Sequence, residues 1–416
     1  MQAEIISIGD ELLIGQTINT NAAWLGEHLN LIGIRVHRST SIADDKKAII
    51  EALDESSSRS QVVIITGGLG PTKDDITKHT LCEYFNTDLV LNQEALERIT
   101  GFFKDRGLTM LEINRQQAAL PRACTVIQNF RGTACGMWFE KDGVVFISMP
   151  GVPYEMHAMM SEQVFPKLVK HFDCPVIQHR TILTIGIGES YLADKIADWE
   201  NSLAEHDIKL AYLPSPGMVK LRMSLYHDEN KSGQEILIRK ESELLDLAGE
   251  YIYGYEKETL PQLVGEMLRK TNETLSIAES CTGGFLAHLI TSIPGSSEYF
   301  ISGLIPYDAK VKVSELGVDN QLIKNYNVVS KEVAEAMSIG CRKKFGTDYA
   351  IATTGVAGPT GGTEEIPVGT IWISVSGPKR TIAMKLKYGK NRENNIRMAS
   401  ESALNLLRKE ILAAND

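Results

Sequence analysis

Residues 62–77 read VVIITGGLGPTKDDIT. Four apolar β-branched residues in a row, at 62–65, predict a strand that is buried on both faces of a sheet. Strand and helix patterns alternate before it, with strands at 4–8 and 34–37 and a helix at 45–56. The chain therefore begins with an α/β layer structure that has a largely parallel sheet.

The glycine-rich loop after this strand is a candidate binding site, because ligands in open α/β sheets collect at the carboxyl ends of strands. The N–H groups of Gly67, Gly68 and Gly70 can face a phosphate, and Asp74 and Asp75 can bind a divalent cation beside it. The alternative is a tight turn whose aspartates cap the next helix.

Acidic residues also follow the first two strands, as Asp10 with Glu11 and Asp44 with Asp45. Parallel strands end at one edge of the sheet, so we expect these acids and those of the glycine-rich loop to converge on a magnesium-like ion. Glu155, after the apolar strand at 144–149, is expected to be a solvated residue at a helix start.

Composition limits the possible classes of protein. The 416 residues predict two to four domains, and a formal net charge of −10 without a Lys/Arg-rich run argues against nucleic-acid binding. The six cysteines include no CxxC pair, which gives neither a zinc site nor a disulfide framework. No signal peptide and no run of ~20 apolar residues is present, so we expect a cytoplasmic protein without membrane contact.

Three N-terminal motifs, GDELLIGQTINTN, TGGLGPTKDDIT and MPGVPYEM, resemble the MoaB/MogA-like molybdopterin-binding domain at the N-terminus of the CinA family. The resemblance covers residues 1 to about 165 and implies a doubly wound, three-layer α/β sandwich over 1–170. In the CinA branch it also implies an ADP-ribose pyrophosphatase that uses a divalent cation such as Mg, Mn or Co. By position it assigns Asp44 and Asp75 to the pocket acids, Gly67, Gly68 and Gly70 to the phosphate-side loop, and Asp10 and Glu11 to the GDE motif.

Residues 176–252 change in character. A strand, a GIGES turn and a helix precede two strands joined by a Pro/Gly loop and a second helix, which predicts a small α+β module. Members of the CinA family carry a KH-like module at this place. We interpret it as a structural spacer that also shapes a dimer, with nucleic-acid binding as the alternative.

Residues 278–284 read AESCTGG between an apolar strand pattern and a helical pattern that begins at Phe285. This arrangement is typical of a nucleophile turn, because a helix N-terminus offers unpaired N–H groups and glycine lets the backbone approach a ligand. The alternative is an ordinary helix start with Ser280 or Thr282 as N-cap.

Two further motifs follow. Tyr307 and Lys312 lie five residues apart, and 353–370 form a glycine-rich loop that reads TTGVAGPTGGTEEIPVGT. Together with AESCTGG they resemble, in order, the C-terminal α/β domain of the CinA family over residues 259–416. The resemblance implies a nicotinamide mononucleotide deamidase that needs no cofactor, and it assigns the family's lysine to Lys312 rather than Lys310.

Hydrolysis of an amide at neutral pH needs a nucleophile, a base and donors for the oxyanion. Ser280 with Lys312 meets this need, since burial can lower the pKa of a lysine enough for it to accept a proton. Tyr307 could relay the proton or orient Lys312, and the N–H groups of 281–284 could form the oxyanion hole. Cys281 is the rival nucleophile, and we expect it to have a packing role.

The remaining site residues are expected to contact the substrate. They are Thr282, Gly283, Gly284, Thr354, Gly355 and, for the phosphate, Arg392. Arg397 is expected to be an exposed charge. Asp308 stands where the family commonly has serine, and its carboxylate is expected to raise the pKa of Lys312.

We therefore expect a bifunctional hydrolase that acts on nicotinamide mononucleotide and on ADP-ribose. Resemblance also implies a homodimer. Two other hypotheses remain at this stage: a molybdopterin-binding protein without hydrolase activity, and a competence or recombination accessory protein.

Overall fold

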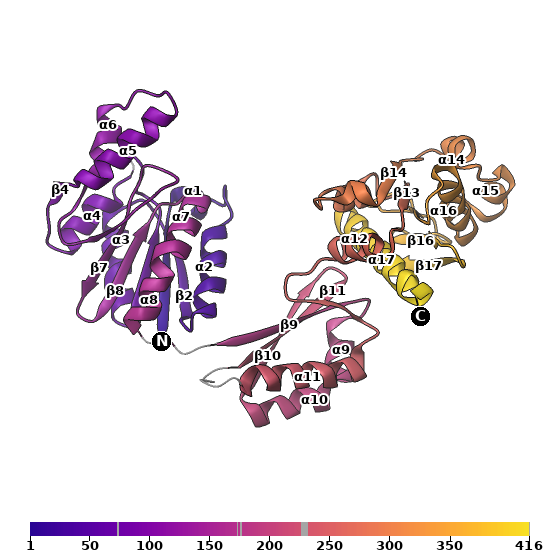
Figure 1. Ribbon diagram of the computed structural model, residues 1–416, viewed down its shortest axis with the longest axis horizontal. Coiled ribbons are helices and arrows are strands. Elements are labelled where there is room, and N and C mark those ends of the chain that lie inside the picture. Colours follow the sequence, from indigo (N-terminus) through magenta and orange to yellow (C-terminus); the bar gives the residue numbers. More distant parts are fainter. Residues whose placement is uncertain (73–74, 173, 175–176, 226–231, 416) are drawn as a thin grey trace. The chain divides into compact units, whose positions relative to one another are not determined.

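The computed structural model describes residues 1–72, 75–172, 174, 177–225 and 232–415 (Figure 1). The chain divides into two compact units. The first consists mainly of Met1–Gln178, and the second of His179–Ser224 together with Gln234–Asp416. Within the described ranges, no helix combines the length and the apolar character that crossing a bilayer requires.

The first unit is built on a mixed sheet with the strand order β2-β1-β3-β8-β7-β6. The strands β2, β1, β3 and β8 run parallel to one another. The strand β7 is antiparallel to β8, and β6 is antiparallel to β7. Their bounds are β1 Gln2–Ile8, β2 Arg35–Ile42, β3 Val62–Thr66, β6 Thr125–Ile127, β7 Gly136–Lys141 and β8 Val144–Met149, with a separate pair of β4 Leu89–Leu91 and β5 Ala119–Pro121.

Helices cover both faces of this sheet, which confirms the expected three-layer α/β sandwich. The alternating side chains of β3 explain the arrangement: Val62 and Ile64 belong to one core, and Val63 and Ile65 to the other. The helices are α1 Asp10–Leu13, α2 Thr20–Leu31, α3 Lys46–Ser57, α4 Thr77–Tyr84, α5 Gln93–Asp105, α6 Glu112–Arg115, α7 Pro153–Met159 and α8 Phe165–Phe172.

The middle module is a four-stranded sheet with the order β10-β11-β9-β12. Its strands are β9 Gln178–Ile185, β10 Ile208–Ser215, β11 Met218–Leu225 and β12 Ile252–Tyr255, and its helices are α9 Glu189–Lys195, α10 Ala197–Ser202 and α11 Ser232–Ala248. Leu183, Ile185 and Tyr253 of this module join the core of the C-terminal domain.

The C-terminal sheet has the order β14-β13-β15-β16-β17. The strand β13 lies between two parallel neighbours, whereas β16 and β17 are antiparallel additions. The strands are β13 Leu275–Glu279, β14 Phe300–Leu304, β15 Tyr349–Gly355, β16 Thr370–Ser376 and β17 Thr381–Lys387.

Helices again pack on both faces of the sheet. Leu275 and Ile277 of β13 pack into a core with α12 Leu260–Thr271, α13 Phe285–Thr291 and α17 Arg392–Asn415. On the other face, Ala278 packs in a core with α14 Ala309–Leu316 and α16 Lys331–Phe345, which α15 Asn320–Tyr326 flanks. The small side chains of Ala278 on β13 and of Ala350 and Ala352 on β15 let the helices approach this face of the sheet closely.

Chain direction positions both candidate sites. The connection from β13 leads to β14 on one side, and the chain then returns to β15 on the other side, so residues 280–284 lie at a topological switch point. In the first unit, β1 lies likewise between β2 and β3. Such points open a crevice at the carboxyl ends of the strands.

We predict that Gly340→Ala destabilises the C-terminal domain, although alanine usually stabilises a helix relative to glycine. Gly340 lies in α16, and a Cβ atom there would overlap with the carbonyl oxygen of Leu316 in α14. Overpacking of this kind costs about 1–3 kcal/mol. Denaturant unfolding of this variant and of wild type gives the sign of the change in the free energy of unfolding.

The matched control is Gly101→Ala in α5, where nothing lies within 4 Å of the added Cβ. This control is expected to stabilise its own domain by about 0.5–1 kcal/mol. Equal and stabilising effects of both substitutions would contradict the close contact between α14 and α16.

Candidate functional site

The nucleophile turn begins where β13 ends. Ser280 N–H donates to the carbonyl of Thr353 on β15 at 3.0 Å, which ties the turn to the sheet. Gly283 and Gly284 then adopt positive φ angles of 61° and 100°, which reverse the chain into α13. Ser280 is 8% exposed and has no N-cap role for α13, because the cap residue is Gly284.

Lys312 lies directly against Ser280. Its Nζ is 3.0 Å from Ser280 Oγ, 2.7 Å from the carbonyl oxygen of Pro306 and 3.1 Å from that of Tyr307. Lys312 is fully buried in the first turns of α14, so these three oxygens are its polar surroundings. A neutral amine has two N–H donors and one lone pair, and two carbonyls with one hydroxyl match that set.

Burial is the dominant influence on this amine and lowers the pKa of Lys312 to about 8. The charges of Cys281 and Asp308 act in the opposite direction and raise the pKa, as expected for Asp308 from the sequence, but they are smaller effects. Asp308 serves as N-cap of α14, where its carboxylate accepts the N–H of Lys310 at 2.8 Å. Asp308 therefore has a capping function at this position.

Tyr307 acts through its backbone rather than its hydroxyl. The side chain is 60% exposed, and its hydroxyl lies 3.5 Å from Arg392 Nη2, whereas its carbonyl oxygen accepts from Lys312. The expectation that the Tyr307 hydroxyl relays a proton is therefore not met by this geometry. The expectation that Tyr307 orients Lys312 is met by the main chain.

The two threonines that were expected to contact the substrate are engaged elsewhere. Thr282 is 2% exposed, and its hydroxyl lies 2.7 Å from that of Thr353. Thr354 is 1% exposed, and its hydroxyl donates to the carbonyl of Val328. Both side chains stabilise the turn and the adjoining loop instead of facing a substrate.

The glycines divide into two groups. A Cβ atom on Gly283 would meet nothing within 4 Å, so this residue borders open space beside Ser280. A Cβ on Gly284 would lie 3.2 Å from Ile305 Cδ1. A Cβ on Gly355, in contrast, would lie 2.6 Å from Ile371 of β16, so this glycine serves sheet packing rather than substrate contact.

Backbone donors are fewer than the sequence suggested. The Gly284 N–H donates to the carboxylate of Glu279, and the Gly283 N–H donates to the Ser280 carbonyl at 3.3 Å. In the part of the chain that the structure describes, the N–H groups of Cys281 and Thr282 donate to no other residue; that of Cys281 faces its own thiol. Of the four N–H groups expected to form the oxyanion hole, those of Cys281 and Thr282 therefore remain available to a substrate.

Cys281 has the environment of a packing residue. It is 5% exposed and belongs to the hydrophobic core of the domain. Burial is the main cause that raises the pKa of its thiol to about 12; the Glu279 carboxylate acts in the same direction, while hydrogen bonds with Thr353 and with its own backbone and the charge of Lys312 oppose the rise. The thiolate that nucleophilic attack requires is therefore strongly disfavoured.

Arg392 is exposed at the first residue of α17, next to Tyr307. Its Nη1 donates to the carbonyl of Gly358 at 2.9 Å, which leaves other donors of the guanidinium directed outward. Arg397 is also largely exposed and lies 3.7 Å from Glu401, so it is a surface charge on the same helix, as expected.

The first unit contains a second candidate site, which we call the acidic hollow. This cavity of about 440 Å³ is lined by Glu11, Asp44, Asp75, Glu155 and the loop glycines Gly67, Gly68 and Gly70, among others. None of its described lining residues is lysine or arginine. Burial raises the pKa of Asp44, the backbone hydrogen bond from Asp10 lowers it, and the charges of Asp10, Glu11 and Asp75 raise it again.

The glycine-rich loop of this hollow is largely satisfied internally. Gly67 N–H donates to the carbonyl of Met149, and Gly70 N–H donates to Asp75 at 2.8 Å. Asp75 also accepts the N–H and the hydroxyl of Thr72. Asp75 therefore caps its own loop, and of the three glycine N–H groups only that of Gly68 has no acceptor among the described residues.

Glu155 differs from the sequence expectation. It is 8% exposed, and its carboxylate accepts from Asn129 Nδ2 at 2.6 Å. Residue 132 is glycine because a Cβ there would overlap with the same carboxylate. The buried Glu155 is thus a further acid of the hollow rather than a solvated residue.

The acids of the hollow lie around one cavity, but their described side chains do not form a coordination shell. In the described ranges, no three acidic, histidine or cysteine side chains are arranged to hold a metal ion. Asp74 lies outside the described residues. The described lining around Asp44 nevertheless carries an excess of negative charge without a basic side chain.

Three family models match successive parts of the chain: a probable molybdopterin binding domain at 4–170, the damage-inducible protein CinA KH domain at 179–254, and the CinA C-terminal domain at 257–411. A CinA-like protein of Flavobacterium psychrophilum is 47% identical over 417 residues, which cover 99% of both chains. This chain belongs to the CinA family.

A CinA-like protein of Cytophaga hutchinsonii is similarly related, with 45% identity over 409 residues that cover 98% of each chain. Among solved structures, the protein CinA of Thermoplasma acidophilum is 35% identical, and the match covers 39% of this chain and 95% of that one with a TM-score of 0.36. The three family models and the two full-length relatives confirm the expected CinA membership and the MoaB/MogA-like and KH-like domains.

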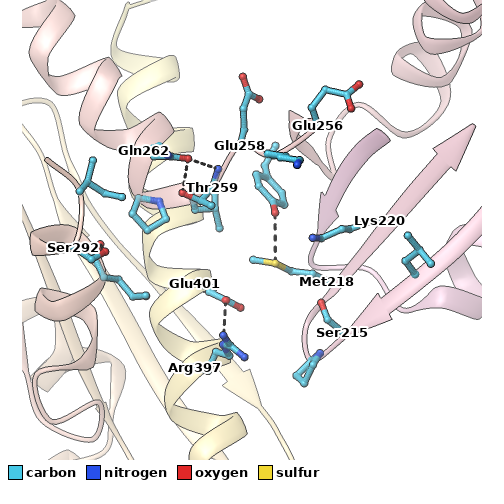
Figure 2. Close-up of a pocket in the computed structure, with 18 of the residues that line it drawn as sticks. Ser215, Met218, Lys220, Glu256, Glu258, Thr259, Gln262, Ser292, Arg397 and Glu401 are labelled. Atoms are coloured by element: carbon cyan, nitrogen blue, oxygen red, sulfur yellow. Dashed lines mark hydrogen bonds and ion pairs between the residues drawn. The ribbon is translucent and has the colours of Figure 1, made fainter. Parts of the chain in front are cut away.

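A larger cavity lies between the CinA KH module and the C-terminal domain, within the second unit (Figure 2). Its volume is about 710 Å³. Figure 2 shows Met218 and Lys220 on one wall, across from Gln262 and Glu401 on the other. Its charged lining is balanced, with the acidic residues Glu256, Glu258 and Glu401 against the basic residues Lys220, Lys257 and Arg397.

This cavity holds none of the residues of the nucleophile turn. Burial raises the pKa of Glu401 to about 7, and Arg397 lowers it. Because Glu256 is paired with Arg180 and Glu401 lies beside Arg397, the walls select neither an anionic nor a cationic ligand.

Sequence reasoning missed the structural roles of Glu279, Thr353 and Glu155. The first two lie within the recognised motifs, Glu279 as the last residue of β13 and Thr353 near the end of β15, where each is a polar residue in an apolar strand. A buried polar residue at that place needs a hydrogen-bond partner, which is a signal that could have been used.

We predict that Cys281 resists alkylation in the folded protein, because its thiol is buried and its pKa is raised to about 12. Iodoacetamide treatment at pH 8, followed by mass spectrometry of the peptide, measures this. The control is the same treatment in urea, which should modify Cys281 fully. Rapid modification of Cys281 in the native protein would restore it as a rival nucleophile.

Proposed function

We propose that the C-terminal domain deamidates nicotinamide mononucleotide to nicotinate mononucleotide and ammonia. The observation that carries this proposal is the fully buried Lys312 amine, which lies 3.0 Å from Ser280 Oγ between two backbone carbonyls. A serine paired with such a base is suited to acyl transfer from an amide. The family resemblance supplies the identity of the substrate.

The first half of the reaction forms an acyl-enzyme. Lys312 Nζ accepts the Ser280 hydroxyl proton while Oγ attacks the carboxamide carbon, and the carbonyl oxygen becomes an oxyanion. The N–H groups of Cys281 and Thr282 are the donors available for it. The C–N bond then breaks, and the protonated Lys312 gives its proton to the departing nitrogen, which leaves as ammonia.

The second half repeats the same steps with water. Lys312 accepts a proton from water as the water oxygen attacks the ester carbon. Lys312 then returns that proton to Ser280 Oγ when the ester bond breaks. Nicotinate mononucleotide is released. Arg392, exposed beside Tyr307, has donors suited to the phosphate of the substrate, and Gly283 borders the space that the ring needs.

Ser280→Ala and Lys312→Met are each predicted to lower kcat for ammonia release by about 10²–10⁴-fold, since each removes one member of the pair. A coupled ammonia assay measures the loss. Lys310→Met is the matched control: this lysine lies on the same helix α14, two residues earlier, and its side chain has no contact with Ser280. Ammonia release by either dyad variant at the wild-type rate would refute the mechanism.

The pH dependence follows from the base. Lys312 must be neutral to accept the proton, and its pKa is lowered to about 8, so kcat/KM is predicted to rise roughly tenfold per pH unit up to pH 8 and to level off above it. Asp308→Asn, which preserves an N-cap, should move the midpoint to lower pH because the Asp308 charge raises the pKa. A rate that is constant from pH 6 to 10 would exclude Lys312 as the base.

A second proposal concerns the acidic hollow, where the absence of basic lining residues among those described favours a cation-dependent function. We propose that the N-terminal domain hydrolyses ADP-ribose with a divalent cation held by Asp44 and Glu11. When bound, such a cation would neutralise charge on the pyrophosphate and lower the pKa of a water molecule. Asp75 holds the glycine-rich loop in shape by accepting the N–H groups of Gly70 and Thr72.

Asp44→Asn is predicted to weaken Mn²⁺ binding at least tenfold, as measured by calorimetry, and to abolish hydrolysis of ADP-ribose. Asp45→Asn is the matched control, because Asp45 is the N-cap of α3 and asparagine can replace it in that role. Mn²⁺ binding without hydrolysis would favour the alternative of a molybdopterin-binding domain. Hydrolysis that persists in chelator would contradict the cation.

A further inference from the structure

Glu279, the last residue of β13, precedes the nucleophile and is 1% exposed. Its carboxylate accepts three backbone N–H groups from the start of α13: those of Gly284 and Leu286 at 3.0 Å each and that of Ala287 at 2.8 Å. Oε2 accepts two of these N–H groups and Oε1 accepts one, so the side chain at the start of the nucleophile turn is bonded to the backbone at its far end.

The charge of Glu279 is unusual in its surroundings. Within the described residues, no lysine or arginine forms an ion pair with it, so its compensation comes from the three N–H groups and the positive end of α13. Burying a carboxylate in this way is costly unless all its hydrogen bonds are made. An ordinary N-cap such as serine could satisfy a helix start without this cost.

The hydrogen bonds of Glu279 decide which donors remain for a substrate. They occupy the N–H groups of the helix start, while Thr353 holds Ser280 through its carbonyl and Thr282 through its hydroxyl. Among the described residues of the turn, the N–H groups of Cys281 and Thr282, directly after the nucleophile, donate to no other residue. An anion is thereby directed to the side of the turn on which Ser280 lies, and away from α13.

We propose that Glu279 is a positioning residue, which clamps the turn so that the N–H groups of Cys281 and Thr282 form the oxyanion hole for attack by Ser280. It touches neither the substrate nor Lys312. This role rests on the proposed amide hydrolysis for its biological meaning, but the geometry that it maintains can be tested without that substrate.

The test substitution is Glu279→Gln in the full-length protein, which keeps the shape but turns one acceptor oxygen into a donor that faces N–H groups. Loss of aligned oxyanion donors costs about 10²–10³-fold in rate. We expect kcat for ammonia release from nicotinamide mononucleotide to fall by about 10²-fold, with KM changed by less than about threefold. A purely structural defect would instead lower the active fraction and leave the midpoint temperature reduced.

The matched control is Glu410→Gln, since Glu410 is a buried carboxylate of the same domain that pairs with Arg380, away from the turn. It should leave kcat unchanged while reporting the cost of neutralising a buried acid. Where Glu279→Gln does not fold, Glu279→Asp takes its place, because it retains the charge but is too short to reach all three N–H groups.

A fluorophosphonate probe provides a readout that is independent of the substrate. Its phosphorus bonds to Ser280 Oγ as the P–F bond breaks and fluoride leaves, Lys312 takes the hydroxyl proton, and the phosphoryl oxygen takes the position of the oxyanion. Labelling should be at least tenfold slower in the Glu279 variant than in wild type and absent in Ser280→Ala.

The outcomes separate the two proposals. Slow labelling in the variant together with no ammonia release by wild type would refute the deamidase and support the clamp. A folded Glu279 variant that labels and turns over within twofold of wild type would overturn the clamp, whatever the substrate.

Discussion

The burial of one amine organises the C-terminal domain. Lys312 is enclosed at the start of α14, where Ser280 and two carbonyls are its polar contacts among the described residues. Keeping an ammonium charged in such a place is costly, and the pKa falls accordingly to about 8. The remaining features of the site follow from this constraint: a tight turn must hold Ser280 at the amine, and the peptide at 306–307 must direct its carbonyls inward.

Both halves of this CinA-family chain solve a similar problem at the end of a central strand. A glycine-rich loop follows β3 and a glycine-containing turn follows β13, and in each an acid takes backbone N–H groups that would otherwise be free. Asp75 does so in the first unit and Glu279 in the second. The glycines are required mainly by close backbone approach, as at Gly67 beside Ile8 and Gly355 beside Ile371. Ligand donors are then the few N–H groups that remain.

The sequence predicted the layers, because a continuous apolar run indicates a strand that is buried on both faces. The need for a base near the nucleophile, together with the family resemblance that assigns Lys312, led to the Ser280–Lys312 pair. It did not predict hydrogen-bond partners that come from distant parts of the chain. The Thr354 hydroxyl donates to the Val328 carbonyl, and the Asn129 amide donates to the Glu155 carboxylate. Nothing in the local sequence pattern indicates either hydrogen bond. Main-chain roles were equally hidden: Tyr307 was recognised from its side chain but holds Lys312 through its carbonyl.

The central claim, that Lys312 is a base held near neutrality by burial, can be measured directly. Carbon NMR of protein labelled at the lysine ε-carbon, with Lys312→Met to assign the resonance, gives the titration midpoint of this amine. The account predicts that one lysine titrates near pH 8, while ordinary lysines titrate near ~10.4. If the resonance that is lost in Lys312→Met does not titrate below about pH 10, the amine is charged at neutral pH and the mechanism built on Lys312 is wrong.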